Sequence, residues 1–183
     1  MGLKLRSGGA AVELPSQAKR RDIALAVARI VVGGYWLYEQ HWKLPPDFGL
    51  RQPRGLMFAF QQGIEYPTLG IYKTFLQTIV VPNFYLFGWL LLLLEVCIGM
   101  SLLLGLLTRA GALLGTLQAV NLLIGAASTP EGPWIYIALV AANLLLLFTP
   151  CNRKYSLDRL LAPRLDTAAE PGSLIGRSLR WLM

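Results

Sequence analysis

The chain has 183 residues, of which 55% are hydrophobic and 15% are charged, and its formal net charge is +7. The hydrophobic share exceeds the roughly 45–50% of soluble domains, and the charged share falls below their usual level of about 25%. These values argue against a disordered chain, a coiled coil and an ordinary soluble enzyme. Two cysteines exclude a disulfide scaffold, and a single histidine excludes most multi-histidine metal sites. The composition therefore indicates a one-domain membrane protein.

The first 22 residues are basic and lack the compact apolar core of a signal peptide, so we expect a cytoplasmic tail. Four apolar runs follow, at residues 23–40, 84–107, 110–127 and 133–149. Each approaches the length of about 20 residues that a helix needs to cross the hydrocarbon layer. The runs predict an all-α integral membrane protein. Its membrane domain is a four-transmembrane-helix bundle over residues 23–161, followed by a second cytoplasmic tail at residues 162–183.

The segment between the first two spans, residues 41–83, is a long outer loop that prolines divide into short pieces. The pieces at 55–64 and 68–81 are too short to cross a membrane. In the second piece, apolar residues recur at helical spacing with polar residues elsewhere on the helix. The pattern favours one or two short interfacial or re-entrant helices over a fifth span.

The distribution of basic residues predicts the orientation in the membrane. Of the 17 Lys and Arg residues, twelve lie in the first 22 residues, in the turn at Arg109 and from Arg153 onward, and four lie in the outer loop. Because cytoplasmic segments are enriched in Lys and Arg, both termini are expected in the cytoplasm of a multi-pass protein of the cell membrane. This topology accounts for the basic charge, so the sequence gives no reason to expect a nucleic-acid partner.

Polar residues at membrane depth are the first candidates for a functional site. Counting 1.5 Å per helical residue, Glu95, Asn121 and Asn143 lie roughly 14–18 Å inside three different spans, and Tyr35 reaches a similar depth. Two interpretations stay open: a polar pocket for a quinone headgroup or a proton, and hydrogen bonds that hold the helices together. Under either interpretation we expect Glu95 to face the bundle interior, because exposing a carboxylate to lipid is costly.

Two further titratable residues are candidates for the same quinone or proton site. Arg29 lies about 10 Å inside the first span and is a conceivable partner of Glu95. His41 lies at the outer end of this span, where Glu39 and Lys43 are spaced for an ion pair, and its reference pKa near 6.5 suits proton transfer. The alternative for His41 is an interfacial polar collar.

Small residues predict where helices approach closely. Gly99 and Gly105 on the second span, with Gly111 and Gly115 on the third, indicate a tight contact between these two spans. Residues 173–183 form a short amphipathic segment, which we expect to order against a partner or the membrane surface, or else to fray.

Several of these motifs together resemble the DoxX/DoxD-like membrane proteins. The matching segments are Arg29-Ile-Val-Val-Gly33-Gly34, Glu95-Val-Cys-Ile-Gly99, Gly105-Leu-Leu-Thr108-Arg109 and Ser156-Leu157-Asp158. The long outer loop is more similar to the DoxD branch. The resemblance implies a four-helix membrane bundle. It also implies a relation to the small membrane subunit of thiosulfate:quinone oxidoreductase, which passes electrons from thiosulfate to quinone.

Two functional hypotheses follow. In the first, the chain is a membrane subunit of a quinone-linked redox complex, with quinone or proton-site candidates Glu95, Arg29, His41, Asn121, Asn143 and Tyr35. In the second, it is a non-catalytic accessory or scaffold subunit of a larger respiratory or photosynthetic complex. Its expected partners are the lipid bilayer and other subunits. One histidine and two cysteines are too few to hold a redox centre, so we expect no metal, no self-sufficient active site and no cofactor bound by this chain alone, and quinone is the ligand that the first hypothesis would bring.

Overall fold

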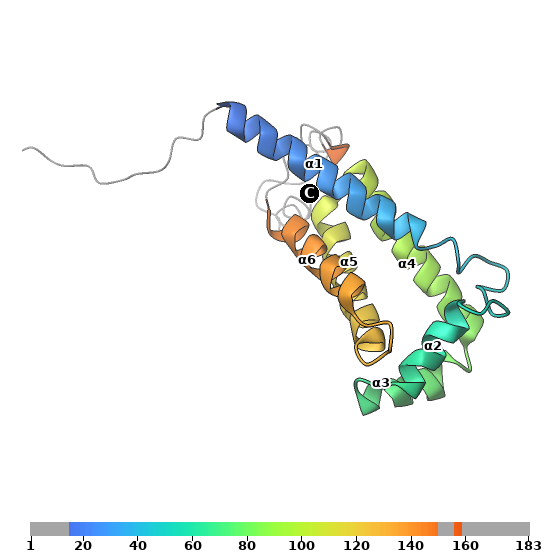
Figure 1. The fold of residues 1–183 in the computed structure, drawn as a ribbon. Coiled ribbons are helices and arrows are strands. Elements are labelled where there is room, and N and C mark those ends of the chain that lie inside the picture. Colours follow the sequence, from blue (N-terminus) through green and yellow to red (C-terminus); the bar gives the residue numbers. More distant parts are fainter. Residues whose placement is uncertain (1–14, 150–155, 159–183) are drawn as a thin grey trace, which may run out of the picture.

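The computed structural model describes residues 15–149 and 156–158, and within these residues it contains helices and no strand. Four long helices dominate: α1 (Pro15–Tyr38), α4 (Phe84–Leu104), α5 (Thr108–Ala126) and α6 (Trp134–Phe148) (Figure 1). Between α1 and α4 lie α2 (Leu56–Glu65) and α3 (Gly70–Phe75), and α3 continues directly into the π-helix η1 (Leu76–Val80). The predicted all-α class is confirmed.

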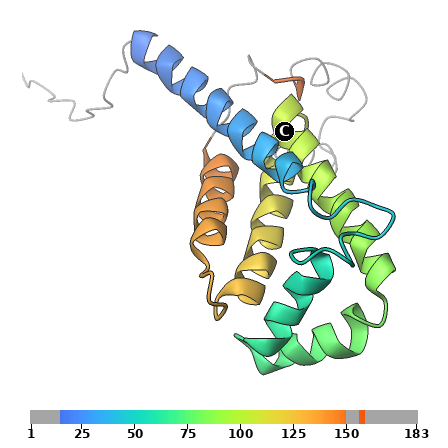
Figure 2. The same ribbon diagram turned by 45° about the vertical axis from the view of Figure 1, so that its right-hand side comes forward.

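The four long helices pack around one hydrophobic core. Helix α1 contacts α4 and α6, and α5 contacts the same two helices. The core contains Trp36 from α1, Ile98 and Leu102 from α4, Ala112 from α5 and Leu146 from α6. Helices α2 and α3 lie at the end of the bundle where α1 ends and α4 begins (Figures 1 and 2). This end is called the loop end below.

The helix boundaries correspond closely to the apolar runs. Helices α4, α5 and α6 begin and end within three residues of the ranges 84–107, 110–127 and 133–149. The outer loop holds the short helices at the two places where its sequence predicts them. Helix α1 differs, because it is already helical at Pro15, within the predicted tail. Lysine, arginine, glutamine and alanine in this stretch all favour a helix. The predicted tail at 162–183 and its amphipathic end lie outside the described residues.

The helices differ in whether their length and hydrophobicity suffice to cross a membrane. Within the part of the chain that the structure describes, α4 is the one helix both long and apolar enough to cross a membrane, and α6 is apolar but has 15 residues. Helix α1 fails this test because it contains Lys19, Arg20, Arg21, Asp22 and Arg29. The sequence predicts four membrane spans. The structure shows that four long helices pack together, and among the described helices α4 has both the length and the composition of a membrane span.

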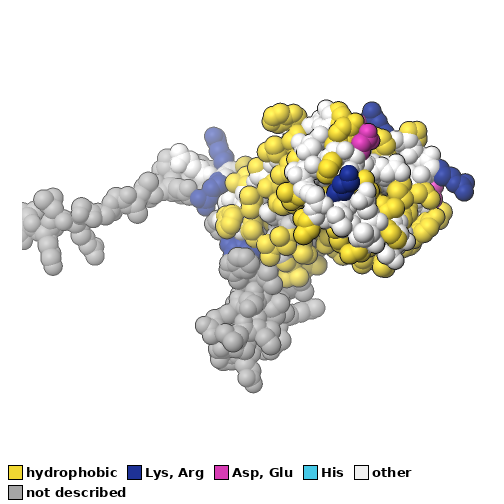
Figure 3. Space-filling model, turned by 90° about the horizontal axis from the view of Figure 1, so that it is seen from below, with side chains coloured by type: hydrophobic (Ala, Val, Ile, Leu, Met, Phe, Trp, Pro, Cys, Tyr) yellow, Lys and Arg dark blue, Asp and Glu magenta, His cyan; other side chains and the backbone are white. Residues whose placement is uncertain are grey.

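The bundle has exposed apolar side chains and buried polar ones. Large hydrophobic residues are exposed on all four long helices, among them Val31, Leu90, Leu117 and Phe148. Figure 3, seen from the loop end, shows hydrophobic side chains over much of the surface with scattered charged groups among them. Large exposed apolar surface marks contact with a membrane or a protein partner.

Glycines lie where helices approach closely. The sequence predicts these contacts between α4 and α5, but some of them are made with other helices. Gly99 contacts Gly33 and Leu37 of α1, and Gly105 contacts Arg29, so these two glycines face α1 instead of α5. The other two glycines of the predicted pair of helices lie on α5. Gly111 contacts Ser101 of α4, as expected, whereas Gly115 lies between Asn143 of α6 and Ile98 of α4.

Two adjacent glycines of α1 give a matched test of this packing. A Cβ atom at Gly33 would lie 2.6 Å from the backbone nitrogen of Leu103 and 2.9 Å from the oxygen of Gly99, whereas one at Gly34 meets nothing within 4 Å. We expect Gly33→Ala to lower the free energy of unfolding by about 1–3 kcal/mol, the cost of overpacking. Gly34→Ala should raise it by roughly 0.5–1 kcal/mol, because alanine favours a helix. Thermal unfolding in mild detergent measures both, and equal shifts would contradict the close α1–α4 contact.

Candidate functional site

A buried carboxylate lies at the centre of the site. The Glu95 side chain projects from α4 and is 1% exposed. Its Oε2 atom forms an ion pair with Lys43 and accepts a hydrogen bond of 2.6 Å from Gln40 Nε2. Its Oε1 atom accepts a hydrogen bond of 3.0 Å from Gln118 Nε2 of α5. The carboxylate thus joins α4, α5 and the turn that follows α1.

The turn after α1 brings two of these partners into the bundle. Its backbone stays tightly wound, with Gln40 N donating to Leu37 O and Lys43 N donating to Gln40 O. The Gln40 amide also donates to Trp36 O at 3.0 Å, which fixes its direction. Farther along, the fully buried ring of Phe48 packs against α4. The segment that carries Lys43 is therefore anchored by Gln40 on one side and by Phe48 on the other.

Pairing makes burial of these charges tolerable. An isolated buried charge is strongly unfavourable, and it becomes acceptable when it is paired and its remaining hydrogen-bonding atoms are satisfied. Glu95 meets both conditions through Lys43, Gln40 and Gln118. The prediction that Glu95 faces the interior is confirmed.

Two ion pairs that the sequence left open are replaced by other contacts in the structure. Lys43 pairs with Glu95 instead of Glu39, and the Glu39 carboxylate accepts a hydrogen bond of 3.2 Å from Trp42 Nε1. Arg29 is buried beside Gly105, which directly follows α4 and lies ten residues beyond Glu95, a separation of about 15 Å along a helix. Arg29 is therefore too far away to pair with Glu95.

The surroundings of Arg29 belong to the opposite end of the bundle. There the segment 156–158 folds back on the turn between α4 and α5. Ser156 Oγ donates to Gly105 O, and the buried Asp158 carboxylate accepts a hydrogen bond of 2.8 Å from the backbone nitrogen of Leu107. Because this carboxylate also lies at the start of α5, where backbone N–H groups lack partners within the helix, it acts as a cap.

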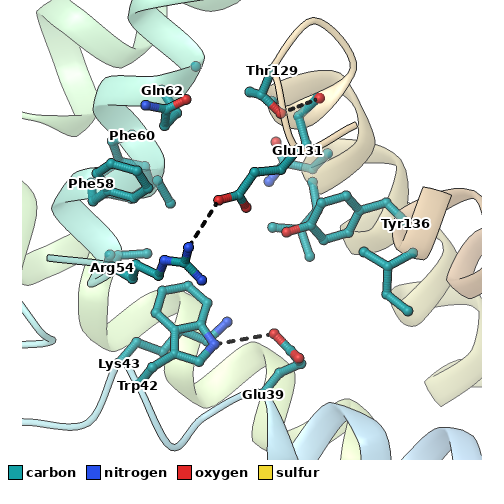
Figure 4. A pocket seen from close by; sticks show the side chains of 18 of the residues that line it. Glu39, Trp42, Lys43, Arg54, Phe58, Phe60, Gln62, Thr129, Glu131 and Tyr136 are labelled. Carbon is teal, nitrogen blue, oxygen red and sulfur yellow. Dashed lines mark hydrogen bonds and ion pairs between the residues drawn. The ribbon is translucent and has the colours of Figure 1, made fainter. Parts of the chain in front are cut away.

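A pocket of about 710 Å³ lies beside the buried carboxylate, at the loop end. Its walls come from the end of α1 and the following turn, from α2, and from the adjoining ends of α5 and α6 (Figure 4). The volume falls in the range of small-molecule sites. Aromatic rings supply much of the lining, namely Trp36, Trp42, Phe58, Phe60, Tyr72, Trp134 and Tyr136.

Polar groups in this pocket lie at two levels of exposure. Arg54 and Glu131 are exposed and face one another at 3.8 Å across the mouth (Figure 4). The polar lining residues that are buried or half-buried include Tyr35, Glu39, Lys43, Gln62, Asn121 and Thr129. A wall that is mostly apolar, with polar groups at defined places, is typical of a site for a largely apolar ligand.

The candidate residues separate into three groups. Tyr35, His41 and Asn121 line the pocket. Glu95 lies behind the wall and reaches the pocket through Lys43, a lining residue. The remaining two candidates, Arg29 and Asn143, are elsewhere.

The two asparagines differ in their relation to Glu95. Asn121 Nδ2 donates to Gln118 Oε1 at 3.5 Å, so it is one step removed from the carboxylate. Asn143 is fully buried between helices, where it contacts Gly115 and donates to Leu139 O at 2.8 Å. Asn143 therefore serves helix packing.

Sequence reasoning missed Lys43, Gln40 and Gln118 as members of the site. A signal existed for Gln118, which lies three residues before Asn121 and thus on the same face of α5. No comparable signal existed for Lys43, because its pairing with a residue 52 positions away depends on how the loop folds. Within residues 15–149 and 156–158, no three His, Cys, Asp or Glu residues are grouped to hold a metal ion.

Comparison with known families identifies the chain. It matches the family described as "TQO small subunit DoxD" over residues 25–178, which is most of its length. The chain therefore belongs to the DoxD family, the small subunits of thiosulfate:quinone oxidoreductase, and the resemblance noted in the sequence is confirmed. The family consists of small subunits of a multi-subunit complex, so membership is consistent with a membrane protein that has other subunits as partners. No curated protein and no solved structure gives a significant match.

The buried ion pair gives a prediction for stability. Lys43→Met alone leaves the Glu95 carboxylate buried without its counter-charge, which should lower the free energy of unfolding by about 3–5 kcal/mol. The double variant Lys43→Met/Glu95→Gln is neutral, so it should be more stable than Lys43→Met. Denaturation in detergent for the wild type, the two single variants and the double variant measures the coupling. Additive effects of the two substitutions would show that the pair does not act as a unit.

Proposed function

We propose that the chain is a membrane subunit of a quinone-linked redox complex and binds a quinone headgroup in the aromatic pocket at the loop end. The observation that carries this proposal is the pocket itself, which combines an aromatic lining with buried or half-buried polar groups. A quinone ring is flat and largely apolar, and its two carbonyl oxygens accept hydrogen bonds. Aromatic side chains suit its faces, and Tyr35, Lys43 and Asn121 supply donors.

One titratable residue of the pocket, His41, suits exchange of protons with the solvent. His41 is exposed, with Nδ1 at 2.7 Å from Tyr38 O, so its other ring nitrogen is left for proton transfer. Tyr72 also lines the pocket, and burial raises the pKa of its hydroxyl above the ordinary value, which keeps the phenol neutral. The electron-transferring centres belong to partner subunits in this proposal, because the chain has too few cysteine and histidine ligands for them.

The proposal places α1, α4, α5 and α6 across the cell membrane, with both termini in the cytoplasm. Exposed apolar side chains on all four helices support lipid contact. The concentration of Lys and Arg in the tails and at Arg109 supports the orientation. The loop end, with the pocket, would then lie at the outer face of the bilayer, and α3 with η1 would lie at the interface.

Topology is tested with single cysteines in a background without Cys97 and Cys151. Arg51 in the outer loop and Lys19 near the start of α1 are both exposed. Arg51→Cys should react with a membrane-impermeant thiol reagent in intact cells, and Lys19→Cys should react only after permeabilisation. The reverse pattern would overturn the orientation.

Ligand binding is tested with the tryptophans that line the pocket. Ubiquinone-1 should quench the fluorescence of the detergent-solubilised wild type saturably, because Trp36, Trp42 and Trp134 are lining residues. Ala126→Trp should reduce the affinity at least tenfold by filling the pocket. Its matched control is Ala127→Trp, at an exposed neighbour outside the lining, which should leave the affinity unchanged. Equal affinities of both variants would place quinone binding elsewhere or exclude it.

A non-catalytic accessory subunit is the second candidate function. It is favoured by the Glu95 carboxylate, whose two oxygens are both engaged by side chains of the chain itself, as expected of an interhelical tie. This function predicts that the wild type co-purifies with partner subunits but shows no saturable quenching by ubiquinone-1.

A further inference from the structure

We propose that Lys43 is the side chain that hydrogen-bonds a quinone carbonyl oxygen and that Glu95 is a positioning residue that holds Lys43 at the pocket wall. The inference rests on the proposed quinone pocket and names the polar contact within it. Lys43 is the residue that belongs both to the buried ion pair and to the pocket lining. Glu95 is not part of the lining, so it acts on a ligand only through its partners.

The ammonium group of Lys43 has hydrogen-bonding capacity to spare. It carries three N–H donors. Within the described part of the chain, the Glu95 carboxylate is its acceptor, and the ring of Trp42 lies 4.7 Å from Nζ. Lys43 as a whole is only 4% exposed, so bulk water has little access to this group. A ligand oxygen in the pocket is a fitting partner for an N–H group that Glu95 does not use.

Glu95 is held firmly enough to orient the lysine. Gln40 and Gln118 fix its two oxygens from opposite sides, and Gln40 is itself anchored to Trp36 O. A free lysine side chain loses much rotamer entropy when it binds a ligand. Here the Lys43 side chain is already ordered by Glu95 in the folded protein, so ligand binding does not have to order it, and such preorganisation raises affinity.

Other polar lining residues are less suited to the role. Arg54 lies at the mouth, paired with Glu131, and is mostly exposed. His41 is exposed as well, and its Nδ1 atom is engaged by Tyr38 O. Asn121 donates to Gln118, which places it at the other end of the hydrogen-bond chain from Glu95 and makes it a secondary contact.

The charge of the pair favours a neutral ligand. Lys43 and Glu95 together carry no net charge, and the Glu39 carboxylate also lines the pocket. An anion close to Lys43 would meet repulsion from both carboxylates in a site shielded from water. A carbonyl oxygen accepts the hydrogen bond without this repulsion. The site therefore selects a neutral carbonyl compound over an oxyanion.

The test uses the full chain in detergent and carbonyl-labelled ubiquinone-1 as the probe. The double variant Lys43→Met/Glu95→Gln removes the ammonium and leaves no uncompensated charge. It should bind about ten- to a hundredfold more weakly than the wild type, as expected for loss of a hydrogen bond from a charged donor. The infrared stretch of the bound carbonyl should be lowered in the wild type and return toward its free frequency in the variant. A purely structural role would not produce this spectral change.

Two further variants complete the design. Lys73→Met removes a partly buried lysine outside the pocket and should change neither affinity nor the carbonyl band. Lys43→Arg keeps the charge and should retain a lowered carbonyl band at a shifted frequency. This variant remains informative if the double variant fails to fold. A carbonyl band at the frequency of free ubiquinone-1 in Lys43→Arg would contradict contact between residue 43 and the carbonyl.

The outcomes separate the two proposals. Saturable binding in the wild type, with affinity and carbonyl band unchanged in Lys43→Met/Glu95→Gln, would overturn the role of Lys43 and leave the quinone pocket standing. No saturable binding of ubiquinone-1 to the wild type would overturn the quinone pocket, and the role of Lys43 with it.

Discussion

The ion pair between Lys43 and Glu95 is the interaction on which the rest of the loop end depends. A carboxylate in the middle of an apolar bundle requires partners, and the nearest helices supply only part of what it needs. Gln118 comes from α5, whereas Gln40 and Lys43 come from the turn after α1. This turn must therefore bend into the bundle. The chain beyond it is then held against α4 by Phe48.

The pocket is a consequence of that arrangement. The end of α1 and its turn form one wall, α2 closes another, and the loop-end parts of α5 and α6 line the rest. Close packing prevails elsewhere, because glycines allow α1 to approach α4, and α5 to approach α4 and α6. The bundle is thus compact in its middle and hollow at one end, which is where a ligand of moderate size fits.

The two ends of the bundle have different chemistry. At the end away from the loop, Arg29, Gly105 and Asp158 close the turn between α4 and α5 and cap α5, which are structural tasks. At the loop end, charged and aromatic groups face a cavity. Under the proposed function, the end away from the loop stabilises the bundle, and the loop end is the part that binds the quinone headgroup.

The sequence by itself determined the helical class, the positions of α4, α5 and α6, the burial of Glu95 and the family. These depend on local signals: long apolar runs, proline and glycine breaks, the cost of an unpaired carboxylate, and motifs read in order along the chain. Only the tertiary structure decided that Lys43 pairs with Glu95, that Arg29 lies at the opposite end, and that Gly99 faces α1. Each of these depends on which surfaces meet across large sequence separations. A helical period indicates that a residue shares a face with its neighbours, but it carries no information about which helix that face will contact.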